Sequence, residues 1–188
     1  MADKTTGDVV DILTTDHREM LELIDQIEKT TDPAERRALT DAVTAEVTRH
    51  SVAEELFVYP VMERELPNGA EEVEHDKQEH KELEVVLKKL EGADAADAEF
   101  MKLIAELKEQ LNHHVDDEES DQFPKLRKHV SAAALKDLGS KVEAAKTIAP
   151  TRPHPGSPNS ELFHMTLGPG VGMVDRLRDA LSGRFRNT

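Results

Sequence analysis

Apolar residues recur at intervals of three and four along the chain up to about residue 120. This spacing places them on one face of an α-helix. The first such face contains Val10, Leu13, Met20, Ile24 and Ile27. Three further segments repeat the spacing, and turn residues separate all four. The pattern therefore predicts four amphipathic helices and an all-α fold.

The second helix has the clearest predicted limits. Asp32 is a suitable N-cap, and Pro33 fits the first helical position. Pro60 cannot donate a backbone hydrogen bond, so we expect it to kink or weaken the later part of this helix. The sequence Pro-Asn-Gly at residues 67–69 ends it.

The other three helices have weaker boundary signals. We expect the first to begin after Thr5 or Thr6. Asn68 is the candidate cap of the third, and Gly92 marks its end. Asp94 is the candidate cap of the fourth.

Histidine and glutamate replace apolar residues at several positions of these inward faces. Two segments read His-x-x-x-Glu-Glu followed by an aromatic-Pro pair, and a single His interrupts each of the two other faces. Residues four apart lie on one side of a helix, so each motif presents an imidazole and a carboxylate together. The six candidate metal-ligating residues are His17, His50, Glu54, His80, His114 and Glu118.

The two halves of this set form an internal repeat. The single His follows an acidic residue in both halves, as Asp16-His17 and as Glu79-His80. The spacing to the next motif His is nearly the same in both halves, 33 residues to His50 and 34 to His114. A duplicated helical hairpin predicts an up-down four-helix bundle with pseudo-two-fold symmetry.

The remainder of the chain is expected to lie outside the bundle. Ser131 is a candidate cap for a fifth helix at residues 132–146. Five Pro and four Gly punctuate residues 149–172 as a linker, and a short amphipathic helix is predicted at about 171–183. We therefore divide the chain into a bundle with an extra helix (1–148) and a tail (149–188). The basic tail could dock on its own acidic bundle, on a protein partner, or weakly on a membrane surface.

Composition narrows the possible partners and locations. The formal net charge of −15 disfavours nucleic acid, because phosphate contacts require Lys and Arg. The absence of Cys excludes disulfides and thiolate ligands. The first residues form no apolar signal segment and no run is long enough for a membrane span, so we expect a soluble, cytoplasmic protein.

The six His and Glu residues could be buried groups satisfied by hydrogen bonds, but a metal site explains them better. Glu54 and Glu118 would be carboxylates in an aliphatic core, which costs several kcal/mol without a compensating cation. Imidazole and carboxylate both bind first-row transition ions. Six side chains from two similar halves suit two metals, with the two Glu bridging.

Four neighbouring residues have less certain roles. Tyr59 points away from His50 on an ideal helix, but a distortion at Pro60 would turn it inward as an additional ligand. Asp121 lies seven residues after His114, where it would either hold a His in orientation or remain solvated. The second Glu of each motif, Glu55 and Glu119, is expected at the surface or supporting a ligand.

Over residues 8–128, this order of motifs resembles the hemerythrin HHE cation-binding family. The resemblance implies a four-helix bundle that holds a non-haem, oxo- or hydroxo-bridged di-iron centre, with the six candidate residues as ligands. The chain departs from the oxygen-carrying hemerythrins, which use five His, because only four inward His are predicted here. This difference favours reaction with peroxide or nitric oxide over reversible O₂ carriage.

Three functional hypotheses follow. The first is a di-iron protein that binds or reacts with O₂, H₂O₂ or NO, in the manner of a peroxidase or catalase. The second is an O₂ or iron sensor that binds without turnover and whose tail signals to a partner. The third is a scaffold without metal.

Overall fold

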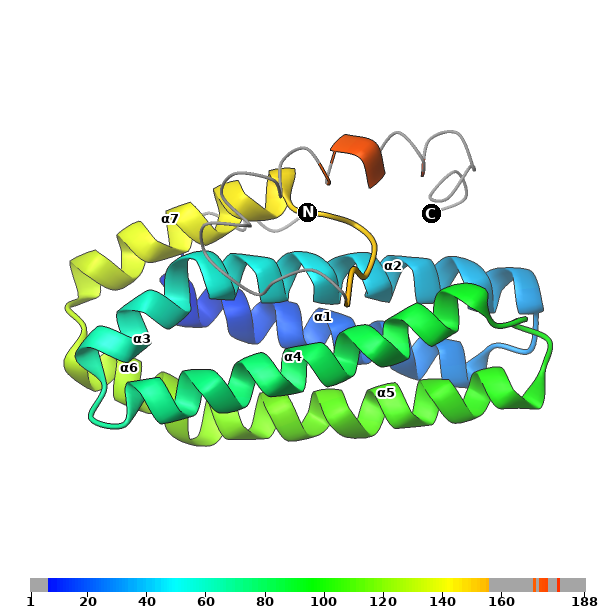
Figure 1. Ribbon diagram of the computed structural model, residues 1–188, viewed down its shortest axis with the longest axis horizontal. Coiled ribbons are helices and arrows are strands. Elements are labelled where there is room, and N and C mark those ends of the chain that lie inside the picture. The colour runs from blue at the N-terminus through cyan, green and yellow to red at the C-terminus, as the bar shows by residue number, and fades with distance from the viewer. Residues whose placement is uncertain (1–6, 156–170, 172, 176–178, 180–188) are drawn as a thin grey trace.

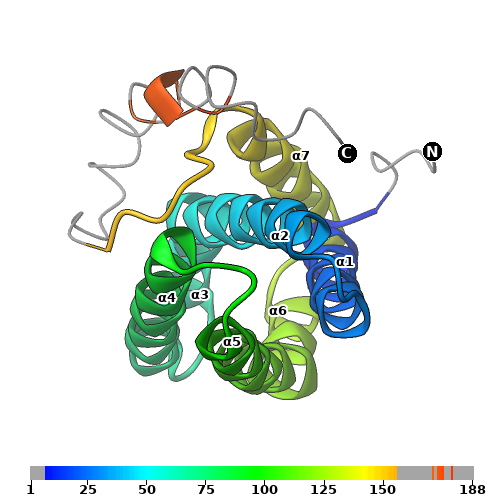
Figure 2. The same cartoon turned by 90° about the vertical axis from the view of Figure 1, so that its right-hand side faces the viewer.

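The computed structural model describes residues 7–155, 171, 173–175 and 179. Within these residues the chain forms helices and no strand, as the sequence predicts. The long helices lie lengthwise beside one another (Figure 1 and Figure 2). Between residues 7 and 155 the α-helices are α1 (Val9–Lys29), α2 (Pro33–Ala53), α3 (Tyr59–Glu65), α4 (Gly69–Gly92), α5 (Ala98–Asp117), α6 (Phe123–His129) and α7 (Ala132–Ile148).

Contacts between the helices define the bundle. Helix α1 packs on α2 and α5, and α4 packs on α5 and α2. Together these contacts enclose a core between α1, α2, α4 and α5, seen end-on in Figure 2. The shorter α3 and α6 continue α2 and α5 at one end of the molecule (Figure 1).

Two of the predicted helix starts are wrong by a few residues. Helix α1 begins at Val9 and not after Thr5 or Thr6, because Asp8 and Asp11 cap it reciprocally with their side chains. The residue before α5 is Asp97. The predicted cap Asp94 lies in the preceding turn, where its side chain accepts a hydrogen bond from the Ala96 N–H.

The other predicted helix starts are confirmed. The Asp32 side chain accepts from the Ala34 N–H, and Pro33 opens α2. Asn68 precedes α4, although its side chain makes no capping bond. Ser131 caps α7 by accepting from the Ala134 N–H.

Each His-x-x-x-Glu motif ends in a wide π-helical turn that the sequence analysis did not anticipate. The two turns are η2 (Glu54–Val58) and η3 (Glu118–Gln122), and both begin at the Glu of the motif. The Tyr59 N–H donates to the Glu54 carbonyl, and the Phe123 N–H donates to the Glu118 carbonyl, five residues back in each case. A Pro follows each donor and could not continue an α-helical ladder. The distortion expected at Pro60 therefore precedes it.

The buried His and Glu side chains form a layer between two apolar clusters. On α1, Leu13 belongs to the first cluster and Met20 to the second, with His17 between them. On α4, Val73 and Leu83 flank His80 in the same way. The bundle therefore surrounds its polar groups with hydrocarbon on both sides, where an unpaired charge is costly.

Helix α7 packs against α1 and α2 on the outside of the bundle, as predicted (Figure 2). The approach is close at Gly139, where a Cβ atom would lie 2.9 Å from Ile12 Cδ1 and 3.1 Å from the Val9 nitrogen. Only Gly fits at this contact without a shift of α1.

The start of the tail contacts the bundle. Arg152 forms ion pairs with Glu91 of α4, at 2.7 Å, and with Asp179, at 2.6 Å. Most of the predicted terminal helix at 171–183 lies outside the described residues. No helix in the described part of the chain combines the length and hydropathy that a membrane span requires.

Candidate metal centre

The four histidines of the repeat bring their Nε2 atoms together in two pairs. The Nε2 atoms of His17 and His50 lie 3.2 Å apart, and those of His80 and His114 lie 3.4 Å apart. All four side chains are buried. Two imidazole nitrogens bound to one metal at about 2.1 Å each are separated by roughly 3 Å. Each pair therefore has the spacing of two ligands of one ion.

The two motif carboxylates lie between these pairs. Glu54 Oε2 is 3.2 Å from His50 Nε2 and 3.4 Å from His80 Nε2. Glu118 Oε2 is 3.2 Å from His17 Nε2 and 3.8 Å from His114 Nε2. Each carboxylate thus contacts one His of either pair, which is the placement of a bridging ligand.

The buried carboxylates have imidazoles as their polar partners. Glu54 Oε1 is buried without a hydrogen bond, and the Oε2 atoms of Glu54 and Glu118 contact imidazole Nε2 atoms. Burial alone would raise the pKa of Glu54, but the charges and hydrogen bonds of His50 and His80 hold it well below its usual value. Burial would lower the pKa of His50, whereas Glu54 and Asp16 raise it to about 10. Without metal, protons on the imidazoles therefore balance the carboxylates, and a divalent cation can replace those protons.

A carboxylate also supports the Nδ1 atom of every one of these histidines. The four contacts join His17 to Glu119 at 2.8 Å, His50 to Asp16 at 3.4 Å, His80 to Glu55 at 3.2 Å, and His114 to Glu79 at 2.9 Å. A proton on Nδ1 donates to each carboxylate, and Nε2 is then free to bind a metal. Support of this kind is typical of His ligands in metalloproteins.

The four supporting carboxylates follow the internal repeat in two ways. Asp16 and Glu79 immediately precede the single His of their own half, and each supports the motif His of that same half. Glu55 and Glu119 instead cross the bundle, and each supports the single His of the other half.

Helix α7 adds a cation that the inward faces of the bundle do not contain. Lys146 Nζ lies 2.6 Å from both Asp16 oxygens, and both side chains are largely buried. Burial would raise the pKa of Asp16, but His50 and Lys146 lower it below its usual value. Asp16 therefore connects the outer helix to a histidine of the central layer.

Tyr59 lies inside the site, next to one His pair. Its hydroxyl is 3.1 Å from His80 Nε2, and its ring is buried. In the other half the equivalent residue is Phe123, whose ring stacks on His17 at 5.7 Å between centroids. The wide η2 turn shifts the helical phase and brings Tyr59 inward. The hydroxyl thus distinguishes two otherwise similar halves.

Comparison with known proteins agrees with this geometry. Residues 8–126 match the sequence profile of the hemerythrin HHE cation binding domain. The chain belongs to the hemerythrin HHE family. It is 32% identical over 174 residues to an uncharacterized hemerythrin-like protein of Schizosaccharomyces pombe, covering 92% of this chain and 86% of that protein. A DNA nickase of Nostoc is 23% identical over 146 residues, covering 78% of this chain and 41% of that protein. No solved structure gives a significant match.

Within this hemerythrin domain, Asp121 takes the solvated one of its two expected positions and not the one that would orient a histidine. Its carboxylate is exposed and pairs with Lys125 on the surface. The extra residue of the η3 turn shifts the phase by about one position, so that Gln122 is buried instead. Gln122 Nε2 donates to Asp76 Oδ1 at 2.8 Å.

Asp76 is a second buried polar residue of this hemerythrin domain, besides Gln122, that was not predicted from the sequence. It lies on the inward face of α4, three residues after Val73 and four residues before His80. This is the spacing of residues on one side of a helix. The corresponding position of the first half is Leu13, four residues before His17. Burial and the nearby Glu118 charge raise the pKa of Asp76 to about 8, and its Oδ2 atom has no hydrogen-bond partner.

The other histidines of the hemerythrin chain lie off the inward face, as expected. His75, His113 and His129 are exposed. His154 contacts Asp175 at 2.9 Å, and His164 lies outside the described residues.

Proposed function

We propose that this chain binds two iron ions in its central His/Glu layer and uses them to react with O₂, H₂O₂ or NO in the cytoplasm. The observation that supports metal binding is the convergence of four buried Nε2 atoms on two buried Glu carboxylates, with Glu54 Oε1 left without a hydrogen bond. Family membership points the same way, since the matching domain is a cation-binding domain.

The ligand assignment follows the two His pairs. His17 and His50 would hold one ion, and His80 and His114 the other. Glu54 and Glu118 would bridge, since each contacts one His of both pairs. A mixed imidazole and carboxylate donor set suits iron. When bound, the two ions would supply Lewis acidity and one-electron redox chemistry.

Tyr59 would act as an additional ligand on the His80 side, which the 3.1 Å contact of its hydroxyl with His80 Nε2 supports. Burial, followed by the charge of Glu54, raises the pKa of its phenol well above the usual value. A nearby metal charge reverses this effect, because it stabilises the phenolate. The site would then have one imidazole pair with a phenolate and one without.

The surroundings of the layer favour small reactants. The His and Glu side chains are nearly inaccessible and lie between two apolar clusters. O₂, H₂O₂ and NO are small enough to reach such a site with little rearrangement, whereas a larger organic substrate is not. A DNA-nicking activity is not proposed for this chain, because the match spans less than half of the DNA nickase and because this chain is strongly acidic.

Metal analysis of the purified protein tests this function. We expect about two irons per chain, and we expect the His50→Ala/Glu54→Ala double variant to lose metal. A matched control, His129→Ala/Glu65→Ala, removes the same side-chain types from the surface and should keep both irons. Full stoichiometry in the first variant would show that the ligand assignment is wrong. Rapid peroxide consumption by the iron-loaded protein would support an enzyme.

The alternative is a sensor that binds O₂ or iron without turnover. The observation that favours it is the chain of contacts from His50 through Asp16 to Lys146 on the outer helix α7. Under this alternative, metal loading changes the hydrogen-exchange rates of α7, and the reduced protein takes up O₂ reversibly without consuming peroxide. Unchanged exchange in α7 on loading would remove this alternative.

A further inference from the structure

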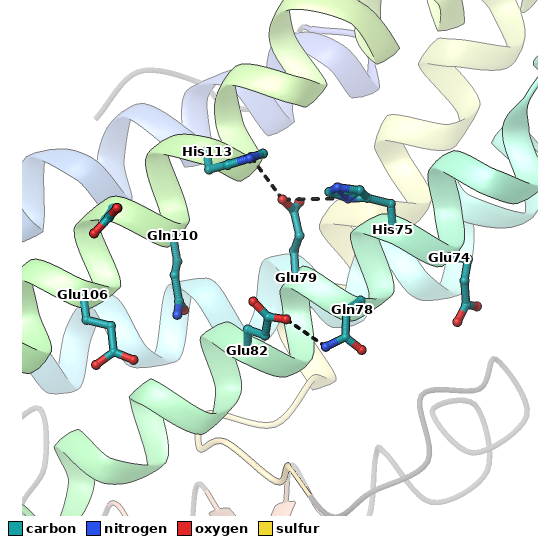
Figure 3. A pocket seen from close by; sticks show the side chains of 9 residues that line it. Glu74, His75, Gln78, Glu79, Glu82, Glu106, Gln110 and His113 are labelled. Carbon is teal, nitrogen blue, oxygen red and sulfur yellow. Dashed lines mark hydrogen bonds and ion pairs between the residues drawn. The ribbon is translucent and has the colours of Figure 1, made fainter.

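A second group of metal-type side chains lies on the surface between α4 and α5. His75 and Glu79 are four residues apart on α4, and His113 and Asp117 are four residues apart on α5. Each helix therefore presents one imidazole and one carboxylate toward the same groove. Figure 3 shows His75 and His113 converging on Glu79 from the two helices.

The distances within this group suit a single ion. His113 Nδ1 is 3.2 Å from Glu79 Oε1 and 3.5 Å from Asp117 Oδ2. His75 Nδ1 is 3.9 Å from the same Glu79 oxygen. One ligand atom from each of His75, Glu79 and Asp117 lies within 4.8 Å of the others. Two imidazoles and two carboxylates are a donor set for zinc, iron or another divalent first-row ion.

The surroundings of this group would concentrate cations. A hollow of about 760 Å³ adjoins it, lined by Glu and Gln side chains in addition to His75, Glu79 and His113. No Lys or Arg is among the described residues that line the hollow. A cleft of one charge sign raises the local concentration of counter-ions. Simple surface pairing explains the group less well, because ligand atoms of His75, Glu79 and Asp117 come within 4.8 Å of one another from two helices and His113 contacts both acids.

Glu79 belongs to this surface group and also to the buried layer. Its Oε1 faces His113 and His75, while its Oε2 accepts from His114 Nδ1 at 2.9 Å. The surface group is nevertheless separate from the proposed iron ligands, because His75 and His113 are exposed and lie off the inward face.

We propose that His75, Glu79, His113 and Asp117 form a surface site for one divalent first-row transition ion, distinct from the buried centre. The four side chains bind the ion at the mouth of the acidic hollow, with Glu79 as the residue shared by the two sites. The surface site does not depend on whether the buried layer holds iron.

Equilibrium dialysis of the iron-loaded protein against Zn²⁺ tests this site. We expect one Zn²⁺ more per chain for the wild type than for His113→Ala/Asp117→Asn, with the iron content unchanged. The matched control His129→Ala/Asp137→Asn removes an exposed His and an exposed Asp elsewhere and should bind as the wild type does. Equal zinc content in the wild type and the first variant would overturn the proposal, as would an equal loss in the control.

A second measurement separates this site from the buried one. Substoichiometric Co²⁺ should broaden the imidazole NMR signal of His75 in the wild type and not in His113→Ala/Asp117→Asn, and it should leave that of His129 unaffected in both. The two proteins share the same buried layer, so the comparison remains valid whether or not that layer holds a metal. Equal broadening of the His75 signal in the two proteins would overturn the surface site alone.

Discussion

Glu119 Oε1 lies 2.8 Å from Nδ1 of His17, so a carboxylate from the second half of the repeat orients a histidine of the first half. Glu55 and His80 form the reciprocal contact at 3.2 Å. Each His pair therefore depends on residues from both hairpins, which makes the site a property of the assembled bundle.

The first prediction concerns this contact. Replacing Glu119 with Ala removes the group that holds the His17 ring, and we expect metal affinity to fall by about 10- to 100-fold. Competition with a chelator measures the change. Asp121→Asn is the matched control, because Asp121 lies in the same η3 turn but is exposed and pairs with Lys125. Equal weakening in both variants would contradict the proposed role of Glu119.

The second prediction concerns Tyr59. Phenolate bound to Fe(III) gives a visible charge-transfer band, so Tyr59→Phe should remove this absorption and leave about two irons per chain. The visible spectrum and iron analysis of the same sample provide the check. An unchanged spectrum would show that the Tyr59 hydroxyl only hydrogen-bonds to His80.

The third prediction concerns Lys146. Removing it leaves the buried Asp16 carboxylate without its cation, and loss of one partner of a buried pair costs about 3 kcal/mol. We expect Lys146→Ala to lower the free energy of unfolding by that amount, measured with urea. On the same helix Lys141 pairs with Asp137 at an exposed site, so Lys141→Ala should change the free energy by less than about 1 kcal/mol. A similar loss in the two variants would exclude a special role for the Asp16 pair.

The fourth prediction concerns the pH dependence of the metal-free protein. Burial raises the pKa of Asp76 to about 8, whereas the value in the unfolded chain is near its usual 3.8. The folded protein therefore keeps a proton that the unfolded chain has lost, and this contribution to stability declines as pH rises from about 4 to 8. The Asp76→Asn variant has no titrating group at this position, so its stability lacks this pH-dependent contribution.

Thermal melts of the metal-free wild type and Asp76→Asn across this pH range measure the effect. The melting temperature of the variant, relative to that of the wild type, should increase as pH rises. A constant difference between the two would show that Asp76 does not titrate in this way.

The sequence was sufficient to predict the helical bundle and the convergence of the six His and Glu residues. Helical periodicity carries this information, since His17 and His80 occupy steps that are otherwise apolar. Asp76 occupies another such step, and the same rule could have found it. Asp76 was not predicted because Val73 and His80, seven residues apart, already lie on the same side of the helix two turns from each other.

The other differences between the prediction and the structure arise mainly at the π-helical turns, where the backbone departs from 3.6 residues per turn. A phase of 3.6 residues places Asp121 inward, but the wide η3 turn brings Gln122 to that side instead. The η2 turn has the same effect on Tyr59. Lys146 could not be placed from the sequence, because its contact with Asp16 depends on how α7 packs against α1.

The crossed support by Glu55 and Glu119 has an evolutionary consequence. A single helical hairpin carries two of the histidines and one bridging glutamate, but it lacks the carboxylate that orients its lone histidine. An ancestral hairpin would have needed a second copy of itself to complete the centre, as a homodimer. In the present chain, exchanging one half for that of another protein would separate each lone histidine from the glutamate that orients it. A recombinant would inherit a histidine without the partner selected to hold it.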